Sequence, residues 1–311
     1  MIELDHATKL YGGRPAVDDV SLTIAHGEIC ALLGTSGSGK STTLRLINRL
    51  VGLDGGRIRL DGTDIATLSA VALRRRIGYV IQSIGLFPHW TIGRNVGTVP
   101  RLLGWPEAKI RDRVEELLTL VGLDPALYRD RYGHELSGGQ QQRVGVARAL
   151  AADPDVLLMD EPFGALDPVT REGLQAEVAR IHKATGKTIV IVTHDVDEAI
   201  TLASHIALME AGRVVQHGTP RDILAAPASP FVANFVGGAK AGLRLLKIET
   251  VGERVRREVA PEGEPVAASA SLDEALGLMI ARGARSLPVS DGARGIVGVV
   301  RLADLVEARV A

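Results

Sequence analysis

The 311-residue sequence predicts an α/β fold built on a mainly parallel core sheet, and three observations support this prediction. Four short apolar runs contain no charged residue, which is typical of strands covered on both faces. One of these runs leads into a glycine-rich turn that precedes a helical segment. At about 150 residues per domain, the length also fits a large domain with a smaller second one. The four runs are residues 29–33, 78–81, 156–159 and 188–192.

The composition excludes several classes of protein. With 46% hydrophobic and 23% charged residues, the chain has the balance of an ordinary folded protein, so disorder is excluded. A net charge of −1 and 3% aromatic residues provide no general attraction for nucleic acid, which is not an expected partner. No run reaches the roughly 20 apolar residues of a membrane span, and residues 1–5 do not resemble a signal peptide. We therefore expect a chain that neither crosses a membrane nor is exported, with its single cysteine, Cys30, buried in an apolar run.

Shorter patterns predict the elements beside the core sheet. Residues 20–24 alternate between apolar and polar side chains, and residues 57–60 lead into the turn Asp61-Gly62. Both features indicate a small antiparallel sheet. Between the second and third apolar runs, residues 110–121 carry apolar side chains at helical spacing, and Gly122 marks the end of that helix.

A second, smaller unit follows a linker. Proline and glycine cluster in residues 226–242, which indicates the end of the main domain. We expect one domain over residues 1–238, and a linker with a small α+β unit over residues 239–311. In that unit, Ser271 and Glu274 form a capping box before a helix. Residues 286–289 and 296–300 are expected strands, and residues 302–310 an expected closing helix.

The sequence GTSGSGKST at residues 34–42 matches the P-loop pattern, between a predicted strand and a predicted helix. Its glycines allow backbone N–H groups to face a phosphate, and the helix N-terminus adds positive charge. Lys40 would neutralise the β- and γ-phosphates, and the Ser41 hydroxyl suits a Mg²⁺ ligand. The predicted cofactors are ATP and Mg²⁺, and the nucleotide-binding residues predicted in this loop are Gly34, Thr35, Ser36, Gly37, Ser38, Gly39, Lys40, Ser41 and Thr42.

A site for phosphoryl transfer also needs a carboxylate for the metal ion and a group that activates water. The apolar run 156–159 ends in Asp160 and Glu161. We expect Asp160 to bind Mg²⁺ next to Ser41, and Glu161 to polarise the attacking water. Two acidic residues at a strand end are commonly just solvated, and the complete P-loop upstream is what favours the catalytic interpretation.

The sequence LSGGQ at residues 136–140 opens a helix that continues to residue 150. Together with the P-loop and Asp160-Glu161, this motif makes residues 1 to 236 resemble the nucleotide-binding subunit of an ATP-binding cassette (ABC) transporter. The resemblance implies a P-loop NTPase fold with an antiparallel β subdomain and a helical subdomain. It also implies a homodimer that encloses two ATP molecules, because the signature of one chain faces the γ-phosphate bound by the other; the signature residues are Ser137, Gly138, Gly139 and Gln140.

Four further residues take their roles from this resemblance. It implies that Tyr11 stacks on adenine, that Asp167 lies in the D-loop at the dimer contact, and that His194 contacts the γ-phosphate. Gln82 would be a Mg²⁺ ligand in a loop that senses the metal ion and the membrane partner, and would act with Glu161 and His194 in catalysis. Three of them have a structural alternative: Tyr11 can be a packing aromatic, Gln82 can cap its strand, and His194 can be a core or turn residue.

Longer segments of the sequence narrow the resemblance to one group of ABC transporters. Residues 81–95 and 131–168 resemble the ATPases of glycine betaine, choline and related osmoprotectant importers. Residues 269–306 resemble a cystathionine-β-synthase (CBS) repeat, which importers of this group carry at the C-terminus. The resemblance implies an energy-coupling ATPase, peripheral on the cytoplasmic face of the inner or plasma membrane. Its partners would be membrane permease subunits and, indirectly, an extracytoplasmic solute-binding protein.

Three other functions remain open at this point. Another small-solute importer, for example for an amino acid, would share the catalytic motifs. A soluble ABC ATPase of DNA repair or translation would carry a long insertion or a second cassette, whereas Lys40 and Ser137 are 97 positions apart. A nucleotide sensor without turnover is disfavoured by Glu161 and His194. The solute itself cannot be read from this chain, because the chain does not contact it.

The single CBS-like repeat leads to separate expectations. An apolar sheet face open to water would pair with the repeat of a second copy; its residues are Leu287, Val289, Val297 and Val299. Arg301 stands where such repeats usually have threonine or serine before Asp304, which disfavours adenosine-nucleotide binding. Two interpretations are open for the arginines of this unit, a solvated surface or a surface that faces anionic lipid or responds to salt; they are Arg254, Arg256, Arg257 and Arg301.

Overall fold

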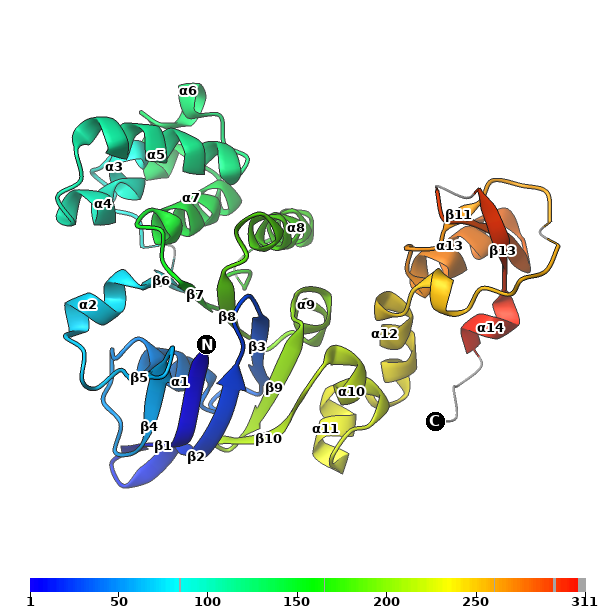
Figure 1. Ribbon diagram of the computed structural model, residues 1–311, viewed down its shortest axis with the longest axis horizontal. Helices are drawn as coiled ribbons and strands as arrows, with labels where there is room; N and C mark the ends of the chain where they lie inside the picture. Colours follow the sequence, from blue (N-terminus) through cyan, green and yellow to red (C-terminus); the bar gives the residue numbers. More distant parts are fainter. Residues whose placement is uncertain (84, 165, 260, 293–294, 307–311) are drawn as a thin grey trace. The chain divides into compact units, whose positions relative to one another are not determined.

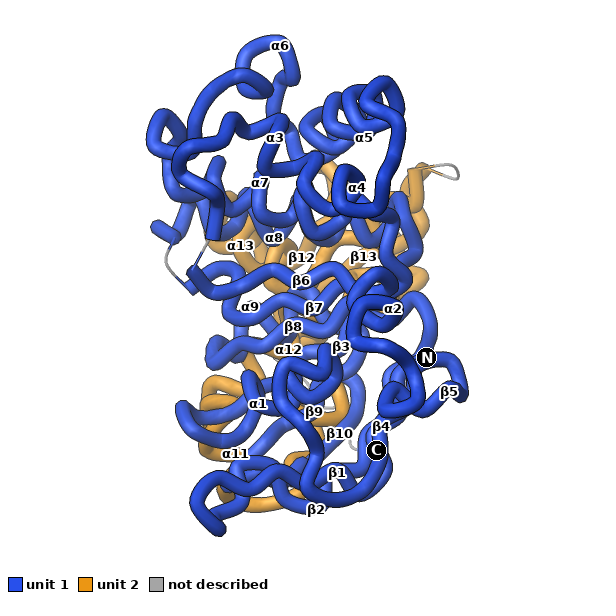
Figure 2. The backbone as a smooth tube through the Cα atoms, turned by 90° about the vertical axis from the view of Figure 1, so that its left-hand side faces the viewer, with its two compact units in different colours: residues 1–219 blue, residues 220–311 orange. Residues whose placement is uncertain are grey.

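The computed structural model describes residues 1–83, 85–164, 166–259, 261–292 and 295–306 (Figure 1). Packing divides the chain into two compact units, Met1–Thr219 and Pro220–Ala311 (Figure 2). The sequence predicts a domain boundary at Gly238 from its composition, whereas the two compact units meet after Thr219. Helices α10 (Pro220–Ala225) and α11 (Pro230–Phe235) therefore belong to the second compact unit. None of the described helices has both the length and the apolar character that a membrane crossing requires.

The core of the first unit is a mainly parallel sheet with the strand order β10-β9-β3-β8-β7-β6. Among the described strands of this core sheet, only β10 runs antiparallel to its neighbour. The apolar runs predicted as strands are confirmed, and every residue of β3, β7 and β8 is buried, as expected for strands covered on both faces. The strands are β3 (Ile29–Gly34), β6 (Ile77–Val80), β7 (Val156–Asp160), β8 (Thr188–Thr193), β9 (His205–Glu210) and β10 (Arg213–Gly218).

An antiparallel sheet with the order β2-β1-β4-β5 accompanies the core sheet, as predicted. Helix α1 (Lys40–Ile47) contacts β3, β7 and β8 of the core sheet and β2 of the antiparallel sheet, so the two sheets share one hydrophobic core. The strands are β1 (Ile2–Tyr11), β2 (Arg14–Ile24), β4 (Gly55–Leu60) and β5 (Thr63–Asp64), and α2 (Ala70–Arg75) follows them. Helices α8 (Pro168–Thr185) and α9 (Val196–Leu202) pack against each other, and α9 contacts β3 and β8.

A helical subdomain lies between β6 and β7 in the chain (Figure 1). The predicted amphipathic helix is α5 (Glu107–Leu120), which buries Ile110, Val114, Leu117 and Leu118. Gly122 follows it with φ +68°, a left-handed conformation that favours glycine at a helix end. The other helices are α3 (Ile92–Val96), α4 (Thr98–Leu102), α6 (Pro125–Tyr128), the 3₁₀ turn η1 (Gly133–Glu135) and α7 (Gly138–Leu150). Helix α7 contacts α3, α5 and β6, and it connects the subdomain to the core sheet.

The second unit contains a small sheet with the order β11-β12-β13. Its predicted helix and strands are confirmed, and the Ser271 hydroxyl accepts a hydrogen bond from the Glu274 N–H at 3.0 Å. The predicted closing helix is described as far as Val306, and residues 307–310 lie outside the described residues. After α10 and α11 the elements are η2 (Gly238–Lys240), α12 (Ala241–Ile248), η3 (Val251–Glu253), β11 (Val266–Ala267), α13 (Leu272–Arg282), β12 (Ser286–Ser290), β13 (Ile296–Arg301) and α14 (Leu302–Val306).

The prediction of an exposed apolar sheet face in this unit is wrong. Leu287, Val289 and Val299 are all buried, and Val297 is half-buried against the same core. Leu246 of α12 and Val251 of η3 join α13 in covering one side of the sheet. On β13, the Val299 backbone exchanges two hydrogen bonds with Arg256, of 2.8 and 2.9 Å. The segment before the repeat therefore buries the sheet within one chain, which removes the basis for pairing with a second copy.

Candidate active site

The P-loop connects the end of β3 with the start of α1. The Lys40 ammonium group donates hydrogen bonds to the carbonyl oxygens of Gly34 at 2.9 Å and Thr35 at 2.7 Å. Lys40 is 5% exposed. Burial lowers its pKa, and the carboxylates of Glu161 and Asp160 oppose that shift. The lysine is thus held in place by neutral carbonyl groups, and its charge is available to an anion at the loop.

Two glycines of the loop are required by close backbone contacts. Gly39 has φ +102°, and a Cβ atom there would lie 2.4 Å from the Ala16 carbonyl oxygen. At Gly34 a Cβ atom would lie 2.2 Å from the Met209 carbonyl oxygen. Any side chain at either position would force the loop away from the strands beside it. Between them, Thr35, Ser36 and Gly37 are exposed, as a loop that receives a ligand must be, and Ser38 is buried; Ser41 and Thr42 are half-buried in the first turn of α1.

Ser41 and Asp160 are in direct contact, as the sequence predicts. The Ser41 hydroxyl donates a hydrogen bond to Asp160 Oδ1 at 2.7 Å, and the Tyr79 hydroxyl lies 3.4 Å from Asp160 Oδ2. Asp160 is buried, and no ion pair with a lysine or arginine involves it among the described residues. Hydroxyl and carboxylate oxygens are the donors that Mg²⁺ prefers, so this pair fits the expected metal ion. Tyr79 could not be identified from the sequence, because the sequence of a strand does not show which residue of a neighbouring strand its side chains contact.

Glu161 lies where the ends of β7, β6 and β8 meet. Gln82 Nε2 donates a hydrogen bond to Glu161 Oε2 at 3.0 Å, and His194 Nδ1 lies 3.6 Å from Glu161 Oε1. Glu161 has φ +46°, a conformation that non-glycine residues adopt rarely and that is concentrated at functional sites. The structure therefore brings together the three residues predicted to act in catalysis.

A buried network holds the loop that carries His194. Thr193 donates a hydrogen bond to Glu198 at 2.5 Å and accepts one from the Asp195 N–H at 3.0 Å. Burial raises the pKa of Glu198, and the nearby Asp195 carboxylate adds to this rise. A polar cavity of about 30 Å³ lies among Glu161, His194 and Thr193, which is room for one water. Sequence reasoning missed Thr193 and Glu198, since their contact depends on how α9 begins.

The signature motif forms the start of α7. Ser137 Oγ accepts a hydrogen bond from the Gln140 N–H at 3.3 Å, and Gln140 Oε1 accepts one from the Ser137 N–H at 2.9 Å. This reciprocal capping fixes the first turn of the helix. Ser137 and Gly138 are exposed, and Gly139 is buried. Among the described residues, no hydrogen bond or ion pair joins residues 137–140 to the P-loop, so one chain does not bring the two motifs together.

Comparison with known proteins decides the family. The ABC transporter family matches residues 17–164, and the CBS domain family matches residues 256–311. The glycine betaine uptake system ATP-binding protein YehX of Escherichia coli (strain K12) is 55% identical over 305 residues, which are 98% of this chain and 99% of that protein. The chain belongs to the ATP-binding subunits of ABC transporters.

Other relatives of this ABC subunit support the same family assignment. The glycine betaine/carnitine/choline transport ATP-binding protein OpuCA of Bacillus subtilis (strain 168) is 50% identical, over 96% of this chain and 78% of that protein. A solved structure, the dimeric post-hydrolysis state of the ATP-binding cassette MJ0796 bound to ADP and Pi, has a TM-score of 0.64 and 33% identity. That match covers 71% of this chain and 99% of the cassette. The subunit is accordingly an ATP-binding ATPase with the fold that the sequence predicts.

The two remaining predicted residues of the ABC subunit lie at the end of β1 and at the start of α8. Tyr11 ends β1, is half exposed, and has the Lys9 ammonium group 5.5 Å from its ring centroid. Asp167 caps α8, and its hydrogen bonds from Thr170, one of them from the backbone N–H at 3.1 Å, lower its pKa. A Cβ atom on Gly139 would come within 2.1 Å of the Thr170 side chain. Thr170, which the sequence did not reveal, thus connects the D-loop with the signature helix.

Proposed function

We propose that this ABC subunit hydrolyses ATP to drive an importer of quaternary-amine osmoprotectants such as glycine betaine or choline. The observation that supports this most is that the similarity to glycine betaine transport proteins includes the C-terminal unit as well as the ATPase domain. An amino-acid importer would share the catalytic cassette, but not this similarity over the whole chain. A soluble ATPase outside transport has no support from these relatives.

We assign the chemistry of hydrolysis to the residues around Glu161. Its carboxylate is the base that accepts the proton of the attacking water, in the polar cavity beside it. Gln82 and His194 orient that carboxylate, and His194 would contact the γ-phosphate of bound ATP. Lys40 and the backbone N–H groups of the loop bind the phosphates. Ser41 and Asp160 would hold Mg²⁺, with Gln82 as a third ligand, and the ion would neutralise charge on the phosphate oxygens.

We propose a homodimer as the active form, because the signature needs a phosphate that its own chain does not supply. Ser137 and Gly138 are exposed at the N-terminus of α7, a helix of 13 residues whose dipole favours an anion. The ATP of a second chain is the ligand that fits this position. The related cassette MJ0796 has been solved as a dimer with ADP and Pi.

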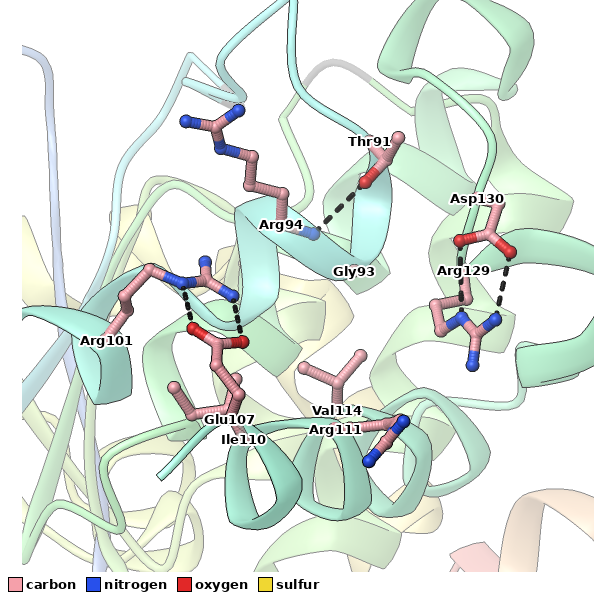
Figure 3. A pocket seen from close by; sticks show the side chains of 10 residues that line it. All are labelled: Thr91, Gly93, Arg94, Arg101, Glu107, Ile110, Arg111, Val114, Arg129 and Asp130. Atoms are coloured by element: carbon pink, nitrogen blue, oxygen red, sulfur yellow. Dashed lines mark hydrogen bonds and ion pairs between the residues drawn. The ribbon is translucent and has the colours of Figure 1, made fainter. Parts of the chain in front are cut away.

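We propose the helical subdomain as the docking site for the membrane permease. A pocket of about 520 Å³ lies among α3, α4, α5 and the end of α6 (Figure 3). Ile110 and Val114 form its apolar floor, and Arg101 and Arg129 lie at its edges, paired with Glu107 and Asp130 (Figure 3). An apolar residue on a short polar segment of the permease fits such a pocket. Docked in this way, the subunit would lie on the cytoplasmic face of the membrane, and the permease would link it to a solute-binding protein.

The test is solute uptake by proteoliposomes that contain the subunit, its permease and the solute-binding protein. We expect ATP-dependent accumulation of radiolabelled glycine betaine or choline, and none with the Glu161→Gln subunit. ATPase activity stimulated by an amino acid, but not by either quaternary amine, would show that the amino-acid alternative is correct. A subunit whose ATPase activity never responds to permease or solute would contradict a transport function.

A further inference from the structure

Four side chains with metal-binding chemistry converge at the end of the core sheet opposite the P-loop. Cys30 belongs to the start of β3, His205 to the start of β9 and His217 to β10, and these strands are neighbours (Figure 1). In the sheet register Cys30 pairs with His205, and His217 pairs with Ala207, two residues further along β9. Since side chains two positions apart share a face, Cys30, His205 and His217 lie on one face, and Glu28 precedes Cys30 by two positions. None of them takes part in the nucleotide site.

The distances within this cluster are those of ligands around a small cation. Ligand atoms of Glu28, Cys30 and His217 all lie within 4.8 Å of one another. Tetrahedral zinc with nitrogen, oxygen and sulfur ligands holds its ligand atoms about 3.3–3.6 Å apart. The His217 side chain can rotate to close this difference, because it is exposed. The exposed ring also provides the route by which an ion enters.

The carboxylate of Glu28 has an unused oxygen. Glu28 is 9% exposed, and its Oε2 accepts a hydrogen bond from the Ala25 N–H at 2.8 Å. Oε1 lies 3.0 Å from His205 Nδ1, yet neither atom has a partner with hydrogen-bond geometry among the described residues. A buried carboxylate oxygen without a partner is costly in a folded protein. Glu28 Oε1 therefore has a lone pair available for a metal ion, and the His205 ring lies beside it.

We propose that Glu28, Cys30 and His217 bind a zinc-type transition-metal ion, with His205 beside Glu28 as a positioning residue. Thiolate, imidazole and carboxylate are the zinc ligands of proteins, whereas Mg²⁺ takes oxygen ligands, so this site differs in metal from the ATP site. Binding displaces the proton of the Cys30 thiol. The negative charges of the thiolate and of Glu28 then balance the two positive charges of the ion. The bound ion joins β3 to β10 across β9 and stabilises the edge of the core sheet.

Cobalt chloride is the first probe, because cobalt bound by a thiolate absorbs in the near ultraviolet and the chain has a single cysteine. We expect this charge-transfer absorption on titration of the full chain without nucleotide, and its loss in Cys30→Ala. Cobalt in the Mg²⁺ site has oxygen ligands and does not give this absorption. Titration without the absorption would overturn the proposal, because Cys30 would then not be a ligand.

Zinc chloride is the second probe, with variants that leave the core intact. We expect zinc affinity to fall at least roughly 100-fold in His217→Gln, and by about 10–100-fold in His205→Gln, the effect of removing a group that orients a ligand. His134→Gln, an exposed histidine of η1, is the matched control and should bind as the unchanged chain does. At a zinc concentration about 100 times Kd, the midpoint temperature of the first thermal unfolding transition should rise by about 5–10 °C. Equal zinc affinity in His217→Gln and the unchanged chain would overturn the site.

Discussion

Lys40 of the first unit and three arginines of the second unit have different kinds of partner. In the first unit, Lys40 donates to two backbone carbonyl oxygens and makes no ion pair among the described residues. In the second unit, Arg254 contacts Glu249 at 2.7 Å, Arg256 contacts Asp304 at 2.5 Å, and Arg301 pairs with Glu258. A cation held by neutral dipoles keeps its charge for an anionic ligand, whereas a cation paired with a carboxylate serves the fold.

This difference bears on three of the four C-terminal arginines for which the sequence left two interpretations open. Arg254, Arg256 and Arg301 have carboxylate partners inside their own unit. Their pairing favours a structural role over a surface that attracts anionic lipid. Asp304 also accepts a hydrogen bond from the Arg301 N–H at 3.0 Å. Both carboxylate oxygens of Asp304 therefore have partners within the unit, and the expectation that the repeat does not bind an adenosine nucleotide stays a prediction.

The largest effect on ATP turnover is expected from a change at Ser137, in the exposed signature motif that is proposed to bind the partner's phosphate. Ser137→Arg should abolish ATP turnover while each chain still binds nucleotide through its own P-loop, because the arginine blocks the partner's phosphate. Mixing it with Lys40→Ala protein should restore one competent site in each heterodimer, detected by phosphate release. A heterodimer verified by sizing chromatography that shows no recovery would contradict a site shared between two chains.

Glu161→Gln should lower hydrolysis by about 10²–10⁴-fold, the contribution of a general base, and leave ATP binding intact. With Mg²⁺ and ATP, the variant should accumulate as a dimer on sizing chromatography. Glu172→Gln, an exposed carboxylate of α8, is the matched control and should hydrolyse ATP normally. Near-normal phosphate release by Glu161→Gln would mean that another group activates the water.

Replacing one cation in each unit by methionine tests the comparison directly. Lys40→Met should weaken ATP binding by about 10- to 100-fold, with little effect on stability, because no carboxylate loses its partner. Arg256→Met should leave ATP binding unchanged and lower the stability of the second unit by about 1–3 kcal/mol, because Asp304 is left buried with one charged partner fewer. Nucleotide titration and denaturant unfolding measure the two effects. The same loss of stability in both variants would remove the distinction.

The smallest expected effect is a pH dependence of the stability of the second unit. Burial raises the pKa of Asp304, but hydrogen bonds from Arg256 and the Arg301 backbone outweigh it and bring the pKa below its usual 3.8. The stabilisation is therefore complete above pH 3.8 and is lost as the pH falls through the lower value of the folded state. Asp304→Asn should be less stable at neutral pH and show a smaller decline in acid. Equal declines in denaturant unfolding at a series of pH values would contradict this role.

Much of the ATP site could be predicted because its parts are local. The P-loop, Asp160-Glu161 and the signature each combine a short pattern with a strand end or a helix start. Residues that complete the site through packing could not be predicted. Tyr79, Thr193 and Thr170 act through neighbours that are distant in sequence or depend on how a helix begins.

The sequence by itself determined the strands, the phosphate-binding loop and the order of the motifs, because periodicity and glycine spacing act over a few residues. Only the tertiary structure decided what the strands bring together. It buried Leu287 and Val289 in a core formed with α13, α12 and η3, where hydropathy alone indicated an exposed face. It also aligned Glu28 and Cys30 with His217, far along the chain, because strand order and register are set by long-range packing.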